Sequence, residues 1–346
     1  MKLKIIAAVC VCVVVIIFGV ALGSVYIPLL DIFNIIRHKV LETFNITSEL
    51  PEHIRPSAVA IVWYSRFPRA LLAFIIGGAL SVSGAVMQSV LRNPLASSYT
   101  LGVSSGASFG ACLVILYGFT LPFAPALTLP VLGFAFGLAT ILLVISFATR
   151  VDVRMDNHTI ILAGMVFSLF VNAITTLLSA LSREHMQRLI FWQMGSFSAK
   201  SWQPIYILLP IVAAGMFLVI HYNRELDMMT FGEEQAKTMG VNLKTVKWML
   251  LISSAALTGS AIAFVGIIGF VDLVAPHIVR RLFGSTHRYV IPMSALFGGA
   301  FMVICDLIAR TIVSPSELPV GAVTAIIGAP FFAYIYFGRR NKARTG

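Results

Sequence analysis

The chain has 346 residues, of which 58% are hydrophobic and 11% are charged, and its formal net charge is +11. A soluble protein carries about 25% charged residues, so this composition excludes an ordinary soluble domain. The apolar residues lie in long runs, each close to the ~20 residues that cross a bilayer. The sequence therefore predicts an all-α polytopic membrane protein.

About ten transmembrane helices are predicted, within a single membrane domain that covers residues 1–346. The first follows Met-Lys-Leu-Lys, but its apolar run is longer than that of a signal peptide, so we expect a retained helix. Only a short stretch separates the seventh span from the eighth, which fits either a tight turn or a broken helix. The approximate spans are 5–25, 68–89, 99–117, 127–148, 159–181, 203–222, 246–264, 266–283, 289–311 and 320–337.

Lysine and arginine are unequally distributed between the two sides of these spans. Their excess lies in the short loops on the side of the N-terminus, which the positive-inside rule assigns to the cytoplasm. We therefore expect a multi-pass protein of the bacterial inner (plasma) membrane with both termini cytoplasmic. This bias accounts for most of the net charge, so lipid is an expected partner and nucleic acid is not.

Small residues recur on the second and third predicted spans. Gly77, Gly78 and Gly84 lie within the second span, and Gly102 and Gly106 lie at the start of the third. Small residues let helix backbones approach closely in a membrane, so these five glycines are predicted as helix-packing positions.

One inner hydrophilic segment, residues 223–245, is longer than an ordinary loop. Its middle, residues 233–239, has a helical pattern, and Gly240 is placed like a helix C-cap. Such a helix fits either an interfacial helix or a docking surface for a cytosolic partner.

Short motifs spread from about residue 60 to residue 335 resemble one family. The chain is similar to the permease subunits of binding-protein-dependent ABC importers for iron-siderophores, haem and vitamin B12. The motifs are RFPR (66–69), GGALSVSGAVMQ (77–88), RNPLA (92–96), LGVSSGA (101–107), ILAG (161–164), FWQMGSF (191–197), GxxxAxxxGV (232–241), GFVDLVAPHIVR (269–280), DLIAR (306–310), ELPVG (317–321) and GAPFF (328–332).

The resemblance implies the architecture of a type II ABC importer. Such a permease pairs with a second permease subunit, as a homodimer or heterodimer, and works with two cytosolic ATPase subunits and an extracytoplasmic substrate-binding protein. The sequence contains no GxxxxGK[ST] phosphate-binding motif, so ATP and magnesium are expected on the ATPase subunits. We predict a non-enzymatic subunit that has no catalytic residue, metal site or cofactor of its own.

The resemblance assigns binding-protein docking to Arg66, Arg69 and Arg310, because the family's matching arginines face acidic residues of that partner. Arginine suits this role, since its guanidinium grips a carboxylate bidentately. The alternative is an ordinary anchor at the membrane surface. Asp306 also lies one turn before Arg310 and could pair with it.

Two inner loops are implied to narrow the cytoplasmic end of the pathway. Asn93 lies in the first of them, and Asn157 and His158 lie in the second. An ordinary turn at Asn93 and an interfacial histidine at His158 are the alternatives.

The inner helix is implied to couple to the ATPase subunits. Its candidate residues are Glu233, Glu234, Gln235, Lys237 and Gly240, and the alternative is a merely solvated surface.

Substrate identity is the least determined feature. Ferric-siderophore chelates are our first choice, because such systems are common in the family, with haem and cobalamin as alternatives. A different class, the ion-coupled secondary transporters, would use intramembrane carboxylates. Only Asp272 and Asp306 approach membrane depth in this sequence.

Overall fold

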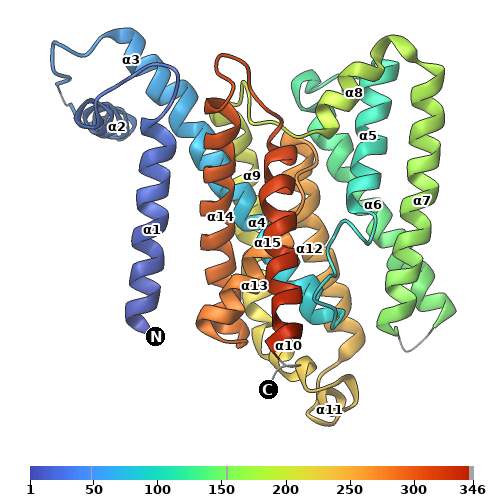
Figure 1. Cartoon of the computed structure of the whole chain (residues 1–346). Helices are drawn as coiled ribbons and strands as arrows, with labels where there is room; N and C mark the ends of the chain where they lie inside the picture. The colour runs from blue at the N-terminus through green and yellow to red at the C-terminus, as the bar shows by residue number, and fades with distance from the viewer. Residues whose placement is uncertain (48, 153–154, 343–346) are drawn as a thin grey trace.

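The computed structural model describes residues 1–47, 49–152 and 155–342, which form helices and loops without a β-strand. Long helices build an upright bundle (Figure 1): α1 Lys2–Ala21, α4 Phe67–Val90, α6 Thr128–Val151, α7 Asn157–Leu181, α9 Trp202–His221, α12 Leu243–Val265, α14 His287–Thr311 and α15 Val320–Lys342. Shorter elements complete it: α2 Leu29–Thr43, α3 Pro56–Ala60, η1 Ile61–Arg66, α5 Val103–Tyr117, η2 Pro125–Leu127, η3 Arg183–His185, α8 Met186–Gln193, α10 Asn223–Thr230, α11 Glu233–Thr238 and α13 Val271–Phe283.

Each of the ten predicted spans contains a helix. Among the described residues, 7 helical stretches are long and apolar enough to cross a membrane. The longest of them, Pro56–Val90, joins α3, η1 and α4 without interruption. α5 and the Val320–Tyr334 part of α15 are shorter apolar helices.

The predicted eighth span, 266–283, contains a shorter helix, α13. Residues 266–270 are not helical, and α13 has only 13 residues. A helix of that length measures about 20 Å, which is short of the ~30 Å hydrocarbon core. Gly266 and Phe270 have φ angles of 81° and 69°, and these positive values interrupt the helical backbone between α12 and α13, in the region where the sequence fitted either a tight turn or a broken helix.

α4 lies in the middle of the bundle, where it packs against α12, α13 and α14. Nearly all of its side chains are buried. A Cβ atom at Gly77 would lie 2.2 Å from the carbonyl oxygen of Gly298, and one at Gly84 would lie 2.0 Å from that of Asp272. Only residues without a side chain permit these helices to approach so closely.

The other predicted packing glycines also face neighbouring helices. A Cβ at Gly106 of α5 would lie 2.2 Å from Oγ1 of Thr140 on α6, and one at Gly102 would lie 2.9 Å from Cγ2 of Thr140. Gly78 has more room, since its Cβ would lie 3.1 Å from the carbonyl oxygen of Ala295.

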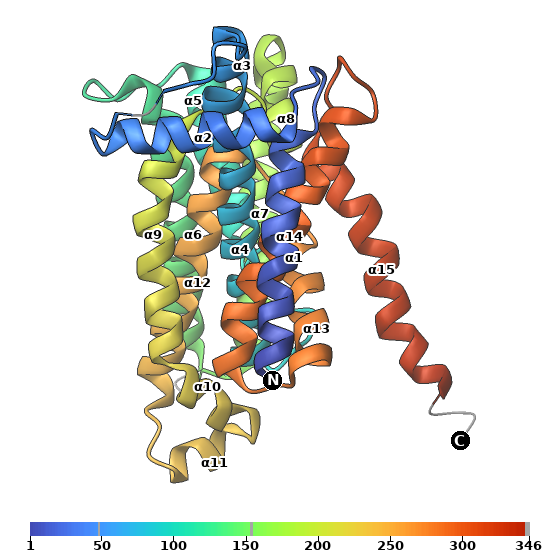
Figure 2. The same ribbon diagram turned by 90° about the vertical axis from the view of Figure 1, so that its left-hand side faces the viewer.

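The two ends of the bundle differ in what they carry. α10 and α11 lie at one end, together with the N-terminus and the last turns of α15, whereas α2, α3 and α8 lie at the opposite end (Figure 1). The end with α10 and α11 is called the inner end, and the end with α2, α3 and α8 is called the outer end. α2 runs across the bundle axis, and α15 leans away from the other helices (Figure 2).

Candidate functional site

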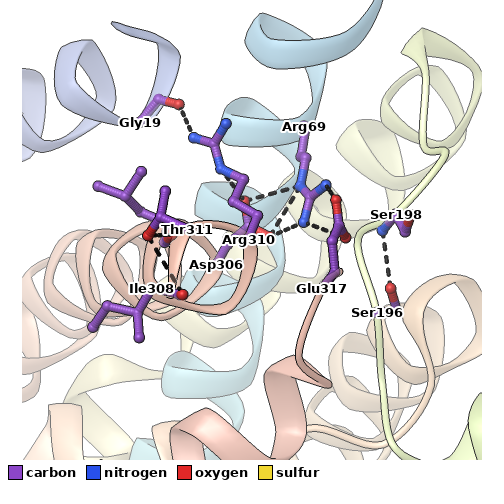
Figure 3. Close-up of polar contacts among 10 residues, drawn as sticks. Gly19, Arg69, Ser196, Ser198, Asp306, Ile308, Arg310, Thr311 and Glu317 are labelled. Atoms are coloured by element: carbon purple, nitrogen blue, oxygen red, sulfur yellow. Dashed lines mark hydrogen bonds and ion pairs between the residues drawn. The ribbon is translucent and has the colours of Figure 1, made fainter. Parts of the chain in front are cut away.

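The outer end contains a buried cluster of charged side chains (Figure 3). Arg69 comes from the first turn of α4, Asp306 from α14, and Glu317 from the loop between α14 and α15. Nε and Nη2 of Arg69 donate to Oδ1 of Asp306 at 3.0 and 2.8 Å, and Nη1 donates to Oε1 of Glu317 at 2.7 Å. One guanidinium group thus joins α4, α14 and the loop before α15.

Burial makes these pairings necessary. The side chains of Arg69, Asp306 and Glu317 are 9%, 2% and 33% exposed. A buried charge is tolerated only where partners of good geometry replace water. Burial alone would raise the pKa of the Glu317 carboxyl, but the hydrogen bond and charge of Arg69 hold that pKa below its ordinary value. Glu317 is therefore an anion at neutral pH that partly reaches the surface.

Two further arginines bind the outer end of α1. Nη1 of Arg66 donates to the carbonyl oxygen of Ala21 at 3.0 Å, and Nη2 of Arg310 donates to that of Gly19. The last carbonyl groups of a helix lack partners within the helix, and these guanidinium groups supply them. Nε of Arg310 also lies 3.6 Å from Oδ2 of Asp306, in the i,i+4 pair that the sequence suggested.

These contacts bear on the predicted docking residues. A docking role implies guanidinium groups that a partner protein can reach, but Arg66 and Arg69 are only 5% and 8% exposed. Arg66, Arg69 and Arg310 all bind acceptors within the chain, so the implied surface charge is absent from this structure. Their docking role stays a prediction. Sequence reasoning missed Glu317, although its place in the ELPVG motif just after the ninth span was an available signal.

At the inner end, Asn93 forms part of the turn after α4. Its Oδ1 accepts a hydrogen bond from the backbone N–H of Leu95 at 2.9 Å, as in an Asx turn. The preceding residue, Arg92, has a φ angle of 50°. The structure thus gives Asn93 a turn-forming contact, and its gate function stays a prediction.

The other two predicted gate residues begin α7. Asp156 caps this helix, since its Oδ1 accepts from the N–H of His158 at 2.8 Å, and the His158 side chain is exposed. Oδ1 of Asn157 accepts from Nζ of Lys247 at 2.9 Å, and Oε1 of Glu233 accepts from the same Nζ at 2.7 Å. Lys247 therefore brings a predicted gate residue and a predicted coupling residue together.

The predicted coupling segment folds into α10 and α11. α11 ends in a Schellman motif, in which Gly240 has a φ angle of 89° and donates to the carbonyl of Lys237 at 2.9 Å. The N–H of Val241 donates to the carbonyl of Ala236 at 3.0 Å, the second bond of that motif. Gly240 thus has the left-handed conformation that a C-cap requires. The exposed residues of this helix include Glu234, Gln235 and Lys237.

Sequence reasoning missed two buried polar residues at the inner end, Lys247 and His287. They are 0% and 1% exposed. A lysine near the end of a span ordinarily extends its ammonium group to the membrane surface, so Lys247 gave no signal of burial. His287 precedes Arg288 in the sequence, so it was expected to be an ordinary polar residue of an inner loop. Their importance depends on partners that are distant in sequence.

Comparison with known proteins gives a family match and close relatives. The profile of the FecCD transport family matches residues 11–338. The uncharacterised ABC transporter permease protein YvrB of Bacillus subtilis (strain 168) is 42% identical over 330 residues, which cover 95% of this chain and 92% of YvrB. The cobalamin import system permease protein BtuC of Halobacterium salinarum is 37% identical over 83% of this chain and 76% of its own length. The hemin transport system permease protein HmuU of Yersinia pestis is 35% identical over 82% and 85%, respectively.

A solved structure has a similar fold. It is described as an inward-facing conformation of a metal-chelate type ABC transporter, and it matches with a TM-score of 0.83 and 27% sequence identity. The match covers 98% of this chain and 100% of that chain. The similarity therefore extends through the whole helical bundle.

Proposed function

Because the chain belongs to the FecCD transport family of ABC importer permeases, we propose that it passes a ferric-siderophore-type iron chelate from an extracytoplasmic binding protein to the cytoplasm, driven by separate ATPase subunits. The observation that carries this proposal is the family match over residues 11–338, which spans almost the whole bundle. The inner end, with α10 and α11, is then cytoplasmic.

A second permease subunit is part of the proposal, and the open surface of α7 supports it. α7 packs against α5 and α6, and only 22% of its most apolar 18-residue stretch is buried. Its exposed residues include Asn172 and Thr176 as well as large apolar side chains. An asparagine side chain facing lipid is costly, since hydrocarbon offers it no hydrogen bond. A second subunit that faces α7 across a hydrated pathway would give Asn172 polar surroundings.

ATPase docking at α11 is supported by the exposed polar side chains of that helix and by its place outside the bundle (Figure 1). At the other end, a carboxylate of the binding protein would compete with Glu317 for Arg69. Docking would then exchange one carboxylate for another instead of filling a free cation site.

The substrate class rests on the family, in which relatives of this chain are named for Fe(3+)-citrate, hemin and cobalamin import. Uptake by proteoliposomes that contain this chain, its ATPase subunits and its binding protein tests the assignment. A radiolabelled ferric hydroxamate chelate, hemin and cobalamin are offered in parallel. We expect the ferric chelate to accumulate in the proteoliposomes. This accumulation should require ATP and the binding protein, and it should continue after ion gradients are collapsed.

Other outcomes of that uptake assay are equally informative. Accumulation of hemin or cobalamin instead would reassign the substrate and keep the importer class. Uptake that needs an ion gradient and no ATP would contradict the proposed function and favour a secondary transporter.

A further inference from the structure

Lys247 lies in the first turns of α12 and is completely buried. Its ammonium group donates to the carbonyl oxygen of Met155 at 2.7 Å, to Oδ1 of Asn157 at 2.9 Å and to Oε1 of Glu233 at 2.7 Å. An ammonium group has three N–H donors, so all three are used. Two of these acceptors belong to the connection into α7, and the third belongs to the first turn of α11.

His287 makes a comparable connection on the other side of the inner end. Its Nδ1 lies 2.6 Å from Oδ1 of Asp227 in α10, and its backbone N–H donates to the same oxygen at 2.9 Å. Its Nε2 lies 2.6 Å from Oγ of Ser89 in the last turn of α4. The carbonyl oxygen of Ser89 accepts from the N–H of Arg92, in the loop that carries Asn93.

Ser89, His287 and Asp227 contact one another in the same sequence as the serine, histidine and aspartate of a hydrolase triad. The surroundings of Ser89, however, argue against a role as a nucleophile. Ser89 is 8% exposed, and its Oγ also contacts the carbonyl of Ala85 at 2.9 Å. Nη2 of Arg280 donates to the same Oγ at 3.2 Å. The Ser89 hydroxyl donates its proton to the carbonyl of Ala85 and accepts from Arg280, so it holds helices together and does not present that proton to His287 as a nucleophile would.

We propose that Lys247 and His287 are positioning residues that connect the cytoplasmic segment, residues 223–240, to the loop before α7 and to the loop after α4, respectively. Each contact joins the segment through a carboxylate, Glu233 for Lys247 and Asp227 for His287. Charge-assisted hydrogen bonds are short and roughly twice as strong as neutral ones, so movement of α10 or α11 pulls on these loops. The inference rests on the proposed function, in which the segment receives the motion of the ATPase subunits.

The first test needs no partner protein. Hydrogen–deuterium exchange is measured on the full chain in lipid nanodiscs for Lys247→Met and His287→Leu. We expect Lys247→Met to speed exchange about tenfold in α11 and in the first turn of α7, and to leave the loop after α4 unchanged. His287→Leu should speed exchange in α10 and the loop after α4, and should leave α7 unchanged. Lys247→Arg and His287→Gln, which keep a donor, should restore part of the protection.

Matched controls are Lys244→Met and His221→Leu, because both side chains are exposed at the same end of the bundle. Uniform loosening of the whole bundle, or no change in either loop, would overturn the proposal. If Lys247→Met or His287→Leu fails to fold, Glu233→Ala and Asp227→Ala remove the same acceptors from partly exposed partners, whose side chains are 24% and 34% exposed.

The second test uses the complete transporter, with its ATPase subunits. Cysteines are placed at the exposed positions Leu95 and His158, after Cys10 is replaced, and their reaction with a membrane-impermeant maleimide is timed without nucleotide and after vanadate trapping. We expect Lys247→Met to lose the nucleotide response at position 158 only, and His287→Leu to lose it at position 95 only. Responses that persist at both positions would overturn the inference. Failure of the wild-type chain to bind an ATPase subunit would instead contradict the proposed function.

Discussion

Arg69 shows how one charged residue organises the outer end. It lies on α4, in the middle of the bundle, and its partners Asp306 and Glu317 are 237 and 248 positions away in the sequence. The ionic contacts therefore hold α4, α14 and the following loop in one arrangement. A residue expected to face a partner protein contributes first to the stability of the bundle.

Replacement of Asp306 by Asn should strongly destabilise this end. The change leaves Arg69 buried with one carboxylate and removes the charge that pairs with Arg310. Breaking a buried ion pair costs about 3–5 kcal/mol, which thermal or chemical unfolding in detergent can measure. Glu42→Gln, which breaks the exposed pair with Lys39, is the control and should leave stability unchanged. Equal stability of the two variants would contradict a structural role for the cluster.

Glu317 should make stability depend on pH in the acidic range. Its pKa in the folded chain is below the ordinary value of 4.5, so its contribution is complete above that value and is lost as pH falls through the folded pKa. The difference in melting temperature between wild type and Glu317→Gln should be constant near neutral pH and should shrink in acid. A difference that grows as the pH falls would show that the sign is wrong.

At the scale of elements, glycines decide how closely helices approach and where one of them ends. Gly84 allows α13 to lie against α4, and Gly240 allows the chain to leave α11 in a left-handed turn. The two positions act differently: the first is limited by space, whereas nothing lies within 4 Å of a Cβ at the second.

Gly84→Ala should force α13 away from α4. The added Cβ would lie 2.0 Å from a backbone oxygen of Asp272, which cannot move alone. Overpacking of this kind costs about 1–3 kcal/mol, measurable as a lower unfolding midpoint in detergent. Gly133→Ala is the matched control, because its Cβ would have neighbours no closer than 3.5 Å. A loss of the same size in both variants would argue against close packing at Gly84.

Gly240→Val should disturb only the end of α11. A β-branched residue in the left-handed region costs about 1–2 kcal/mol, although there is space for its side chain. We expect weaker recovery of the ATPase subunits or less uptake, with membrane insertion unchanged. Gly269→Val is the control, since it also has open space and is not among the positive-φ glycines. Normal uptake and recovery in Gly240→Val would favour a plain interfacial helix.

At the scale of the whole molecule, the bundle is a membrane domain with unlike ends. The outer end carries the arginine cluster and α2, and the inner end carries α10, α11 and both buried polar connections (Figures 1 and 2). This polarity matches a protein that is approached by different partners from the two sides of a membrane.

The purified chain should not hydrolyse ATP. Its sequence contains no GxxxxGK[ST] loop to cradle phosphates, so turnover should appear only when ATPase subunits are added. Phosphate release by the chain alone, by the ATPase subunits alone and by the complex is the measurement. Robust turnover by the chain free of contaminating ATPase would contradict the assignment.

Local sequence signals were sufficient to predict the class of protein, its helical architecture and the placement of both termini at one end of the bundle. They also predicted the left-handed C-cap at Gly240. These features depend on local composition: apolar runs of a given length, loop charges, and a glycine after a short helical pattern. Such signals lie within a few neighbouring residues, so they can be interpreted without knowledge of the fold.

The pairing of polar groups, in contrast, depends on how the helices pack in three dimensions. Arg69 contacts Glu317, and Lys247 contacts Asn157 across 90 positions of sequence, because helices that are distant in sequence pack side by side. Packing also fixes the start of α13 at Val271, since the left-handed residues before it belong to a loop that packs against other elements. A charge in an apolar bundle must have a partner, but its own sequence neighbourhood does not say which residue the fold will bring to it.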